Sequence, residues 1–221
     1  MYPEFDAVVP HPEGVDPSAL IHERAYIVRG YRLDAETLLL RGAIRDQKPP
    51  GLYIKGDPLP LTMHHMIVDM RIHMPTLEIV DAKAVLETHP HTTCPRIADH
   101  YGNLVGLSVA RGYTHKVREL FGGPRGCTHT TALLQAMAPV AVQSTWSFRM
   151  AGRRDGSATP DDVDESRRRS TLMNLNTCHV WAEDGEIVTA LRSGAAPEYP
   201  ISVRKRLAEL GREVDTWLEN G

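Results

Sequence analysis

The chain has 221 residues, of which 42% are hydrophobic and 24% are charged. This balance is typical of a globular chain that buries a core without disulfide or metal support, and it excludes a disordered chain and a mini-protein. The formal net charge of -3 gives no overall positive field for nucleic acid or for an anionic membrane. We therefore expect a small-molecule partner and no nucleic acid.

Neither a membrane span nor an export signal is visible. Hydrophobic runs stop well short of the roughly 20 residues that cross a bilayer. The first 14 residues carry acids and prolines where a signal peptide needs a basic start and an apolar core. We expect a cytoplasmic protein. Its three cysteines do not make a disulfide framework, so each is a buried side chain, a ligand or a nucleophile.

The N-terminal third predicts an arm followed by a β-hairpin. Residues 1–18 are rich in proline and acid without periodicity, which indicates an extended arm. Between residues 24 and 45, apolar side chains nearly alternate around a turn at 33–36, which predicts two antiparallel strands. The segment 47–60 holds four prolines and is a loop.

Strands and then helices follow. The β-branched, alternating segments 66–71 and 77–86 predict two more antiparallel strands. Apolar side chains at helical spacing begin after Pro95, which suits a first helical position. A short helix is predicted over 116–121 with Thr114 as its cap, and a long core helix from Thr128 to Trp146, with Pro139 inside it.

The C-terminal part predicts a charged surface loop over 151–170, free to act as a mobile lid, then a hairpin over 178–191 and a closing amphipathic helix over 201–218. The fold class is therefore α+β: an antiparallel sheet with helices packed on one face. We expect one domain over 1–221, with its core in 20–145. The N-terminal strands permit a homodimer without requiring one.

A glycine-dense loop over residues 122–129 gives the strongest chemical signal. It delivers Cys127 and His129 at the first turn of the core helix, where a thiolate is stabilised. Cys127 is therefore a candidate ligand or nucleophile; the alternative is a buried thiol beside a surface imidazole. Cys94 also lies in a polar loop at a helix start, and it could meet Cys127 in space.

Two further groups are candidates. His64 and His65 are adjacent strand residues that point to opposite faces, so one of them at most reaches a shared site. Four basic residues near the glycine loop could hold a carboxylate or phosphate, or could form a solvated helix face. They are Arg111, Lys116, Arg118 and Arg125.

The stretch from Leu20 to Ser144 resembles an uncharacterised bacterial family, a domain of unknown function. The resemblance lies in short motifs: His22-Glu23-Arg24, His64-His65-Met66, Cys94-Pro95, Leu104-Val105-Gly106 and the GGxxGCTH sequence from Gly122 to His129. It implies an association with aromatic or steroid catabolism and no mechanism.

Residues 66–141 also resemble, in layout, the iron–sulfur scaffold proteins of the NifU N-terminal type. In that family three cysteines and an aspartate surround a cluster or a zinc ion. The resemblance puts the second and third cysteines on Cys94 and Cys127 and the aspartate on His65, whereas the first cysteine falls near Met63, which supplies no thiolate. What remains is a mixed nitrogen–sulfur site.

Such a site, with Cys94, Cys127 and one or two of His65, His129 and His64, suits zinc. The first hypothesis is a metal-dependent hydrolase or lyase acting on an acidic, aromatic or CoA-linked carbonyl compound, with His64 or His129 moving protons. The second is a carrier of iron, zinc or a cluster. The third is a metal-free enzyme with Cys127 as nucleophile and His129 or His64 as base.

Overall fold

The computed structural model describes residues 9–110, 112–157, 174–195 and 199–213. The chain divides into two compact units, Met1–Thr145 and Trp146–Gly221, and the boundary falls inside a long helix. The single domain predicted from the length stays a prediction. No helix among the described residues is long and apolar enough to cross a bilayer.

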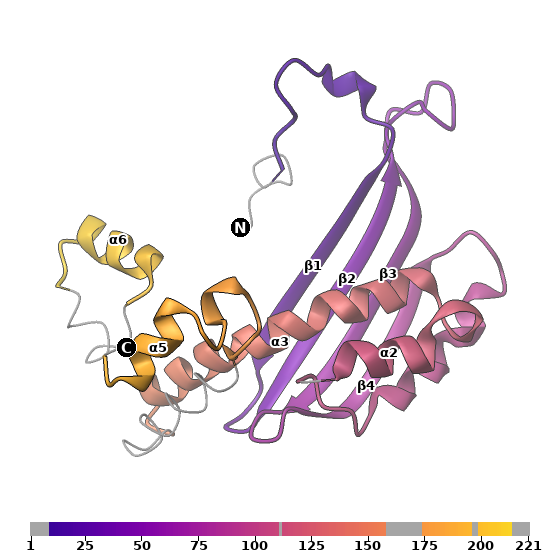
Figure 1. The fold of residues 1–221 in the computed structure, drawn as a ribbon. Coiled ribbons are helices and arrows are strands. Elements are labelled where there is room, and N and C mark those ends of the chain that lie inside the picture. The colour runs from indigo at the N-terminus through magenta and orange to yellow at the C-terminus, as the bar shows by residue number, and fades with distance from the viewer. Residues whose placement is uncertain (1–8, 111, 158–173, 196–198, 214–221) are drawn as a thin grey trace. The chain divides into compact units, whose positions relative to one another are not determined.

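The first unit is built on a four-stranded antiparallel sheet (Figure 1), as the alternation of apolar residues predicted. The strands follow in chain order, β1-β2-β3-β4. They are β1 (Glu23–Arg32), β2 (Thr37–Lys48), β3 (Leu61–His73) and β4 (Glu78–Thr88). The β1–β2 turn lies at the predicted place, where the Asp34 carboxylate accepts hydrogen bonds from the backbone N–H groups of Glu36 and Thr37.

One face of the sheet forms the core, and its side chains follow the period of two that a strand imposes. In β2 the buried positions Leu38, Leu40 and Ile44 alternate with more exposed ones, and β3 repeats the pattern at Met66, Val68, Met70 and Ile72. Leu40 pairs with Met70 and Ile44 with Met66, so the two rows run side by side.

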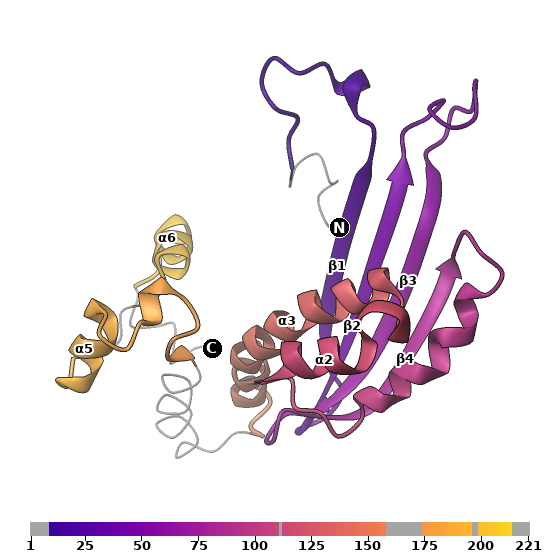
Figure 2. The same cartoon turned by 45° about the vertical axis from the view of Figure 1, so that its right-hand side comes forward.

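Helices cover this face (Figures 1 and 2). They are the 3-10 helix η2 (Cys94–Leu104), α2 (Tyr113–Phe121), the short η3 (Gly123–Arg125) and α3 (Thr128–Arg154). A side chain at Gly42 of β2 would collide with Met137 of α3, and one at Gly30 of β1 would meet Ser144. The absence of a Cβ at these two strand positions lets α3 lie close against the sheet.

The helix predicted after Cys94 is present, and it is a 3-10 helix throughout. The start of the next helix needs correction. Helix α2 begins at Tyr113 after Gly112, whose φ of 86° is accessible to glycine, so Thr114 lies inside the helix and is not its cap. Burial of Tyr113 fixes this earlier start, because the helix gains a third core contact beside Val117 and Phe121.

In the second unit, the predicted hairpin over 178–191 is wrong. The structure has η4 (His179–Trp181) and α5 (Glu186–Arg192) there. A short apolar run fits a strand and a helix equally well, and the buried Val188 lies on the helix. The closing helix is confirmed in part as α6 (Ile201–Glu209), and residues 214–218 lie outside the described residues.

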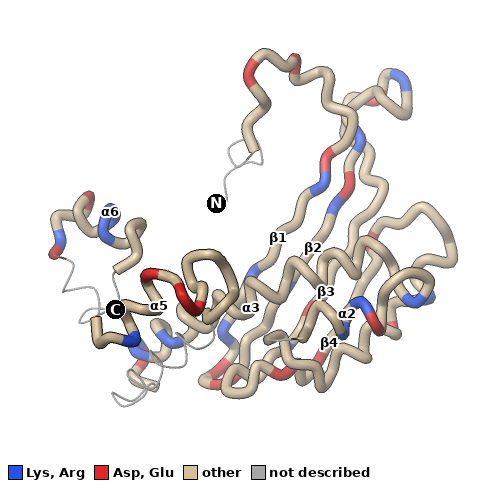
Figure 3. Tube along the Cα trace, viewed as in Figure 1, with Lys and Arg blue, Asp and Glu red and all other residues tan. Residues whose placement is uncertain are grey.

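The ends of the chain also differ from expectation. The described part of the arm, residues 9–18, is exposed and enters η1 (Pro17–Ala19), and residues 1–8 lie outside the description. Of the predicted loop 151–170, residues 151–154 belong to α3 and 158–170 lie outside the described residues. Basic and acidic residues are interspersed along the strands and α2 (Figure 3).

Candidate metal centre

A buried carboxylate ends the core-facing row of β2. Counting from Ile44 by the strand period brings Asp46 to the same face, and its exposed fraction is only 2%. Asp46 pairs in register with His64 of β3, which continues the row of Met66 and Val68. The alternation that builds the core thus also places a carboxylate and an imidazole next to each other at its edge.

His129 reaches the same place from the first turn of α3. The glycine loop before it packs tightly on α2: a Cβ at Gly126 would lie 2.5 Å from the carbonyl oxygen of Phe121. The buried Tyr101 of η2 fixes the next residue, because its hydroxyl accepts a hydrogen bond from the Cys127 N–H at 2.7 Å. These contacts set where α3 begins and therefore where His129 lies.

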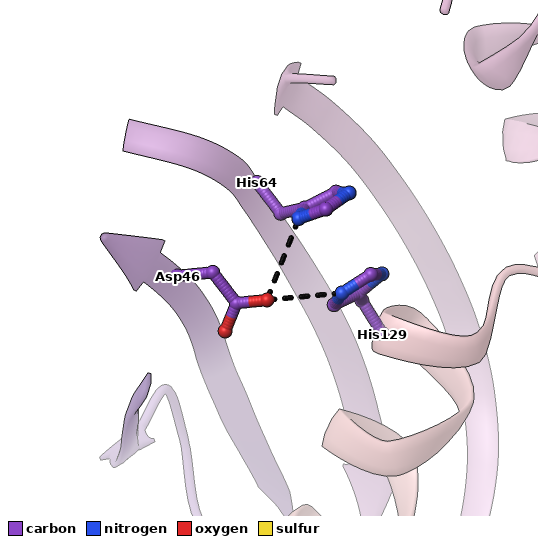
Figure 4. A group of neighbouring side chains, drawn as sticks. All are labelled: Asp46, His64 and His129. Carbon is purple, nitrogen blue, oxygen red and sulfur yellow. Dashed lines mark ion pairs between the residues drawn. The ribbon is translucent and has the colours of Figure 1, made fainter. Parts of the chain in front are cut away.

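The three side chains converge on one carboxylate oxygen (Figure 4). His129 Nε2 lies 3.0 Å and His64 Nδ1 lies 3.4 Å from Oδ2 of Asp46. The imidazole rings stack, with centroids 3.8 Å apart and an interplanar angle of 22°. Among the described residues, this is the only group of three or more His, Cys, Asp or Glu side chains whose ligand atoms all lie within 4.8 Å of one another.

Arg24 of β1 holds the carboxylate from the other side. Its Nε and Nη2 donate to Oδ1 and Oδ2 of Asp46 at 2.6 and 2.7 Å, a bidentate pair that fixes the plane of the carboxylate. His22 lies farther out, with Nε2 at 3.8 Å from Oδ1. Since Arg24 uses one lone pair of Oδ2, the other remains directed at the two imidazoles.

The protonation states follow from burial and charge. Burial raises the pKa of the Asp46 carboxyl, but the hydrogen bonds and the charge of Arg24 outweigh this and hold the pKa below its usual value. Burial lowers the pKa of His64 despite the nearby carboxylate. Burial and the neighbouring His64 lower the pKa of His129. At neutral pH the group therefore consists of one carboxylate and two neutral imidazoles, the forms in which these side chains bind metal ions.

One atom of the group lacks a partner. His64 Nδ1 is buried and makes no hydrogen bond within the described part of the chain, because its contact with Asp46 has the distance but not the alignment of one. Leaving a buried polar atom unpaired costs about 1–3 kcal/mol. Ligand atoms about 2.1 Å from a tetrahedral zinc ion lie roughly 3.4 Å apart, so the observed separations of 3.0 and 3.4 Å suit an ion bound between them.

The predicted metal ligands are only partly brought together. His129 belongs to the group, and so does His64, which we predicted chiefly as a proton carrier. His65 is the neighbour of His64 on β3 and pairs with Arg45, so alternation turns it to the opposite face. Cys94 begins η2, is half-buried and is not in the group.

Cys127 has a different place from the one predicted. Its Sγ lies 3.9 Å from Nδ1 of His129, whereas Nε2 of the same ring faces Asp46. The thiol is thus on the far side of the imidazole from the carboxylate and outside the group of three. It is positioned to accept a hydrogen bond from His129 Nδ1–H, which would fix the ring tautomer.

Two members of the predicted basic cluster, Lys116 and Arg125, make local contacts. Arg125 donates to the carbonyl oxygens of Glu119 and Arg118 and so closes the C-terminal end of α2. Lys116 pairs with Glu119 at 2.9 Å. Arg118 is exposed on α2, and Arg111 lies outside the described residues. Their role in substrate binding stays a prediction.

Asp46 is not among the residues predicted for the site, and Arg24 is noted there only as part of the motif His22-Glu23-Arg24, although a signal existed. In both β2 and β3 the alternating apolar row ends in a side chain that can bind a metal, Asp46 in one and His64 in the other. A carboxylate in phase with a core row demands a partner. Arg24 of β1 pairs in register with Asp46 and is that partner.

One of the comparisons with known proteins gives a match, and it lies within the first unit. A family model described as "Protein of unknown function (DUF2889)" matches residues 22–143, more than half of the chain, and the chain belongs to this family. The searches of curated proteins and of solved structures find no match. They therefore lend no support to the NifU-type layout.

Proposed function

We propose that the protein is a metal-dependent enzyme that holds a zinc ion between Asp46, His64 and His129. The observation that carries this proposal is the buried His64 Nδ1, which lacks a hydrogen bond and lies beside the carboxylate oxygen that His129 also faces. Two imidazoles and one carboxylate form the ligand set of many catalytic zinc sites, which leave a position open for water or substrate. The same set also suits Fe(II).

The chemistry we propose is hydrolysis or carbon–carbon cleavage of a small carbonyl compound. A dication at an open three-ligand site polarises a carbonyl oxygen and lowers the pKa of bound water. The chain supplies the remaining parts: Arg24 keeps the Asp46 carboxylate in place, and the Cys127 thiol is positioned to accept a hydrogen bond from Nδ1 of His129 when that nitrogen carries the proton. His22, at 3.8 Å from Asp46, is the nearest further imidazole.

Metal content of the purified full chain tests the site. We expect about one zinc ion per chain, lost in Asp46→Asn, His64→Gln and His129→Gln. His65→Gln is the matched control, since it changes the adjacent imidazole on the opposite face and should retain the metal. Retention of zinc in His64→Gln and His129→Gln would overturn the proposal, and loss of zinc in Cys94→Ser and Cys127→Ser would instead support the thiolate site.

The contact between Cys127 and His129 favours a second candidate, a metal-free enzyme with a thiol nucleophile. The His129 ring contacts both groups: its Nδ1 lies 3.9 Å from Sγ of Cys127, and its Nε2 lies 3.0 Å from Oδ2 of Asp46. In this case His129 takes the thiol proton while Asp46 orients the ring. In chelator-treated protein, iodoacetamide should then alkylate the Cys127 thiol rapidly, and the substitution His129→Gln should slow this alkylation. Alkylation of Cys127 no faster than that of the half-buried Cys94 would exclude the candidate.

A further inference from the structure

The two ends of the sheet differ in their connections. At the end where β1 begins, β2 ends and β3 begins, which we call the site end, the β2–β3 connection takes residues 49–60 and the arm precedes β1. At the opposite end, residues 33–36 and 74–77 form tight turns. Asp46, His64 and Arg24 all lie within three residues of a strand terminus at the site end. Long connections at one end of a framework are where binding functions concentrate.

The connections at the site end (Figure 1) carry exposed apolar side chains. The six nearest to the strand ends in the chain have exposed fractions from 40% to 70%, and we call them the apolar rim: Leu20, Ile21, Leu52, Tyr53, Ile54 and Leu59. Val9 and Val15 are exposed farther back on the arm. The turns at the opposite end carry one such side chain, Leu33 at 47%, and Leu77 there is buried. Apolar patches of this kind on a soluble protein mark sites of interaction.

Internal turns hold the loop part of the rim in place. The Leu52 N–H donates to the Pro49 carbonyl at 3.3 Å, and the Asp57 N–H donates to the Ile54 carbonyl at 3.1 Å. Lys48 Nζ lies 5.2 Å from the centre of the Tyr53 ring. The four prolines of the loop restrict it further. The apolar side chains are thus presented by an ordered loop, which lowers the entropy cost of binding a ligand.

The rim is joined through the chain to the three strands at whose ends Arg24, Asp46 and His64 lie. Ile21 directly precedes His22, whose Nε2 lies 3.8 Å from Asp46. Antiparallel pairing brings the start of β1 next to the end of β2, so the arm and the loop both leave the sheet at the site end. The charges of the loop, Lys55 and Asp57, cancel. This neutral, apolar loop suits an uncharged hydrocarbon body better than an acidic one.

We propose that the substrate is a carbonyl compound with an apolar body, whose polar head reaches Asp46, His64 and His129 and whose body contacts the apolar rim. The inference rests on the proposed function and names the substrate class of the same site. It predicts that affinity grows with the length of the apolar body, and that the rim and not the metal ligands controls this growth.

The test uses the zinc-loaded full chain and a series of n-alkyl hydroxamic acids, from acetohydroxamic to octanohydroxamic acid, with binding measured by calorimetry. Hydroxamates bind zinc through two oxygen atoms, so only the alkyl chain varies. We expect the affinity to rise with each methylene, by up to about fourfold where the methylene is fully buried. In the double variant Leu52→Ser/Ile54→Ser the rise should fall by at least half, while acetohydroxamic acid binds as in the wild type.

Leu33→Ser is the matched control, because it removes an equally exposed apolar side chain at the opposite end of the sheet. It should leave the whole series unchanged. Equal affinities across the series in the wild type, or an undiminished rise in the double variant, would overturn the proposal. So would a dimer that dissociates in the double variant, since the rim would then be an interface between two copies of the chain.

Failure of the metal site is read separately. If the chain takes up no zinc, the proposed function fails, and the series is repeated with n-alkanoic acids on the metal-free protein. An affinity that rises with chain length and depends on Leu52 and Ile54 would still support an apolar ligand at the rim. A flat series would overturn the inference as well.

Discussion

At the scale of single residues, the Arg24–Asp46 ion pair of the first unit contains a buried carboxylate. The Asp46 side chain is 3% exposed, so its charge depends on Arg24 for compensation, and the two nearby imidazoles are neutral. A second Arg–Asp pair with the same bidentate geometry, Arg41–Asp69, joins β2 to β3 at an exposed position. The sheet thus contains a buried and an exposed version of one interaction.

We expect Arg24→Gln to lower the free energy of unfolding by about 1–3 kcal/mol, because it leaves a buried carboxylate short of its strongest donor. Arg41→Gln should cost less than about 1 kcal/mol, since water replaces an exposed guanidinium. Urea unfolding of both variants provides the comparison. Adding Asp46→Asn to Arg24→Gln should recover part of the loss, and equal costs for the two arginine variants would contradict the interpretation.

The residue scale also shows what a sequence reveals about chemistry. Cys127, His129 and His64 stand out because thiols and imidazoles are few, and two of these three enter the group. Asp46 does not stand out, because it is one of 28 acidic residues and its burial follows from pairing with β1 and β3. Residue type alone therefore favoured a thiolate site, whereas register favours a carboxylate.

At the scale of elements, the glycine loop acts through close packing and not through positive backbone angles at its key position. Gly126 has an extended backbone, with φ of -158°, that any residue adopts. Its lack of a Cβ matters because the Phe121 carbonyl lies where a Cβ would stand, at 2.5 Å. The loop can therefore bring the start of α3 directly onto the end of α2.

We expect Gly126→Ala to shift the first turn of α3 and so to weaken zinc binding by at least tenfold, because a displaced His129 no longer faces Asp46. Gly102→Ala in η2 is the control, since a Cβ there meets no atom within 4 Å. Zinc titration of both variants measures the effect. Normal zinc affinity in Gly126→Ala would show that the loop does not set the position of His129.

The elements that could be predicted are those whose hydrophobic periodicity fits only one type of secondary structure. Long alternating runs such as Thr37–Lys48 predict strands, and the apolar spacing after Thr128 predicts α3. The run over 178–191 was read wrongly because seven residues of α5 satisfy both periods. The 3-10 form of η2 has no signal of its own, since its apolar spacing is also helical.

At the scale of the whole molecule, every residue of the candidate metal centre belongs to the first compact unit, and the family match of residues 22–143 lies within it. The second unit starts inside α3. Because no metal ligand lies after His129 in the group, metal binding should depend on the first unit alone.

We therefore expect a variant that ends after Ser157 to fold and to bind zinc with the stoichiometry of the full chain. A variant that ends after Ala138 is the control. It lacks Ala141, which is buried, and Ser144, which lies against Gly30 of β1, and we expect that it does not fold. Circular dichroism measures whether the two variants fold, and metal analysis measures how much zinc they bind. Loss of zinc from a folded Ser157 variant would show that the second unit contributes to the site.

The sheet and its long helix differ in how far apart along the chain their contacts lie. Each strand pairs with the next one, so the sheet is assembled from neighbouring segments, whereas Met137 and Ser144 of α3 meet Gly42 and Gly30 about a hundred residues earlier. Loop closure over such a span is slow. Docking of α3 should therefore limit the folding rate, and His129 joins Asp46 and His64 only at that step.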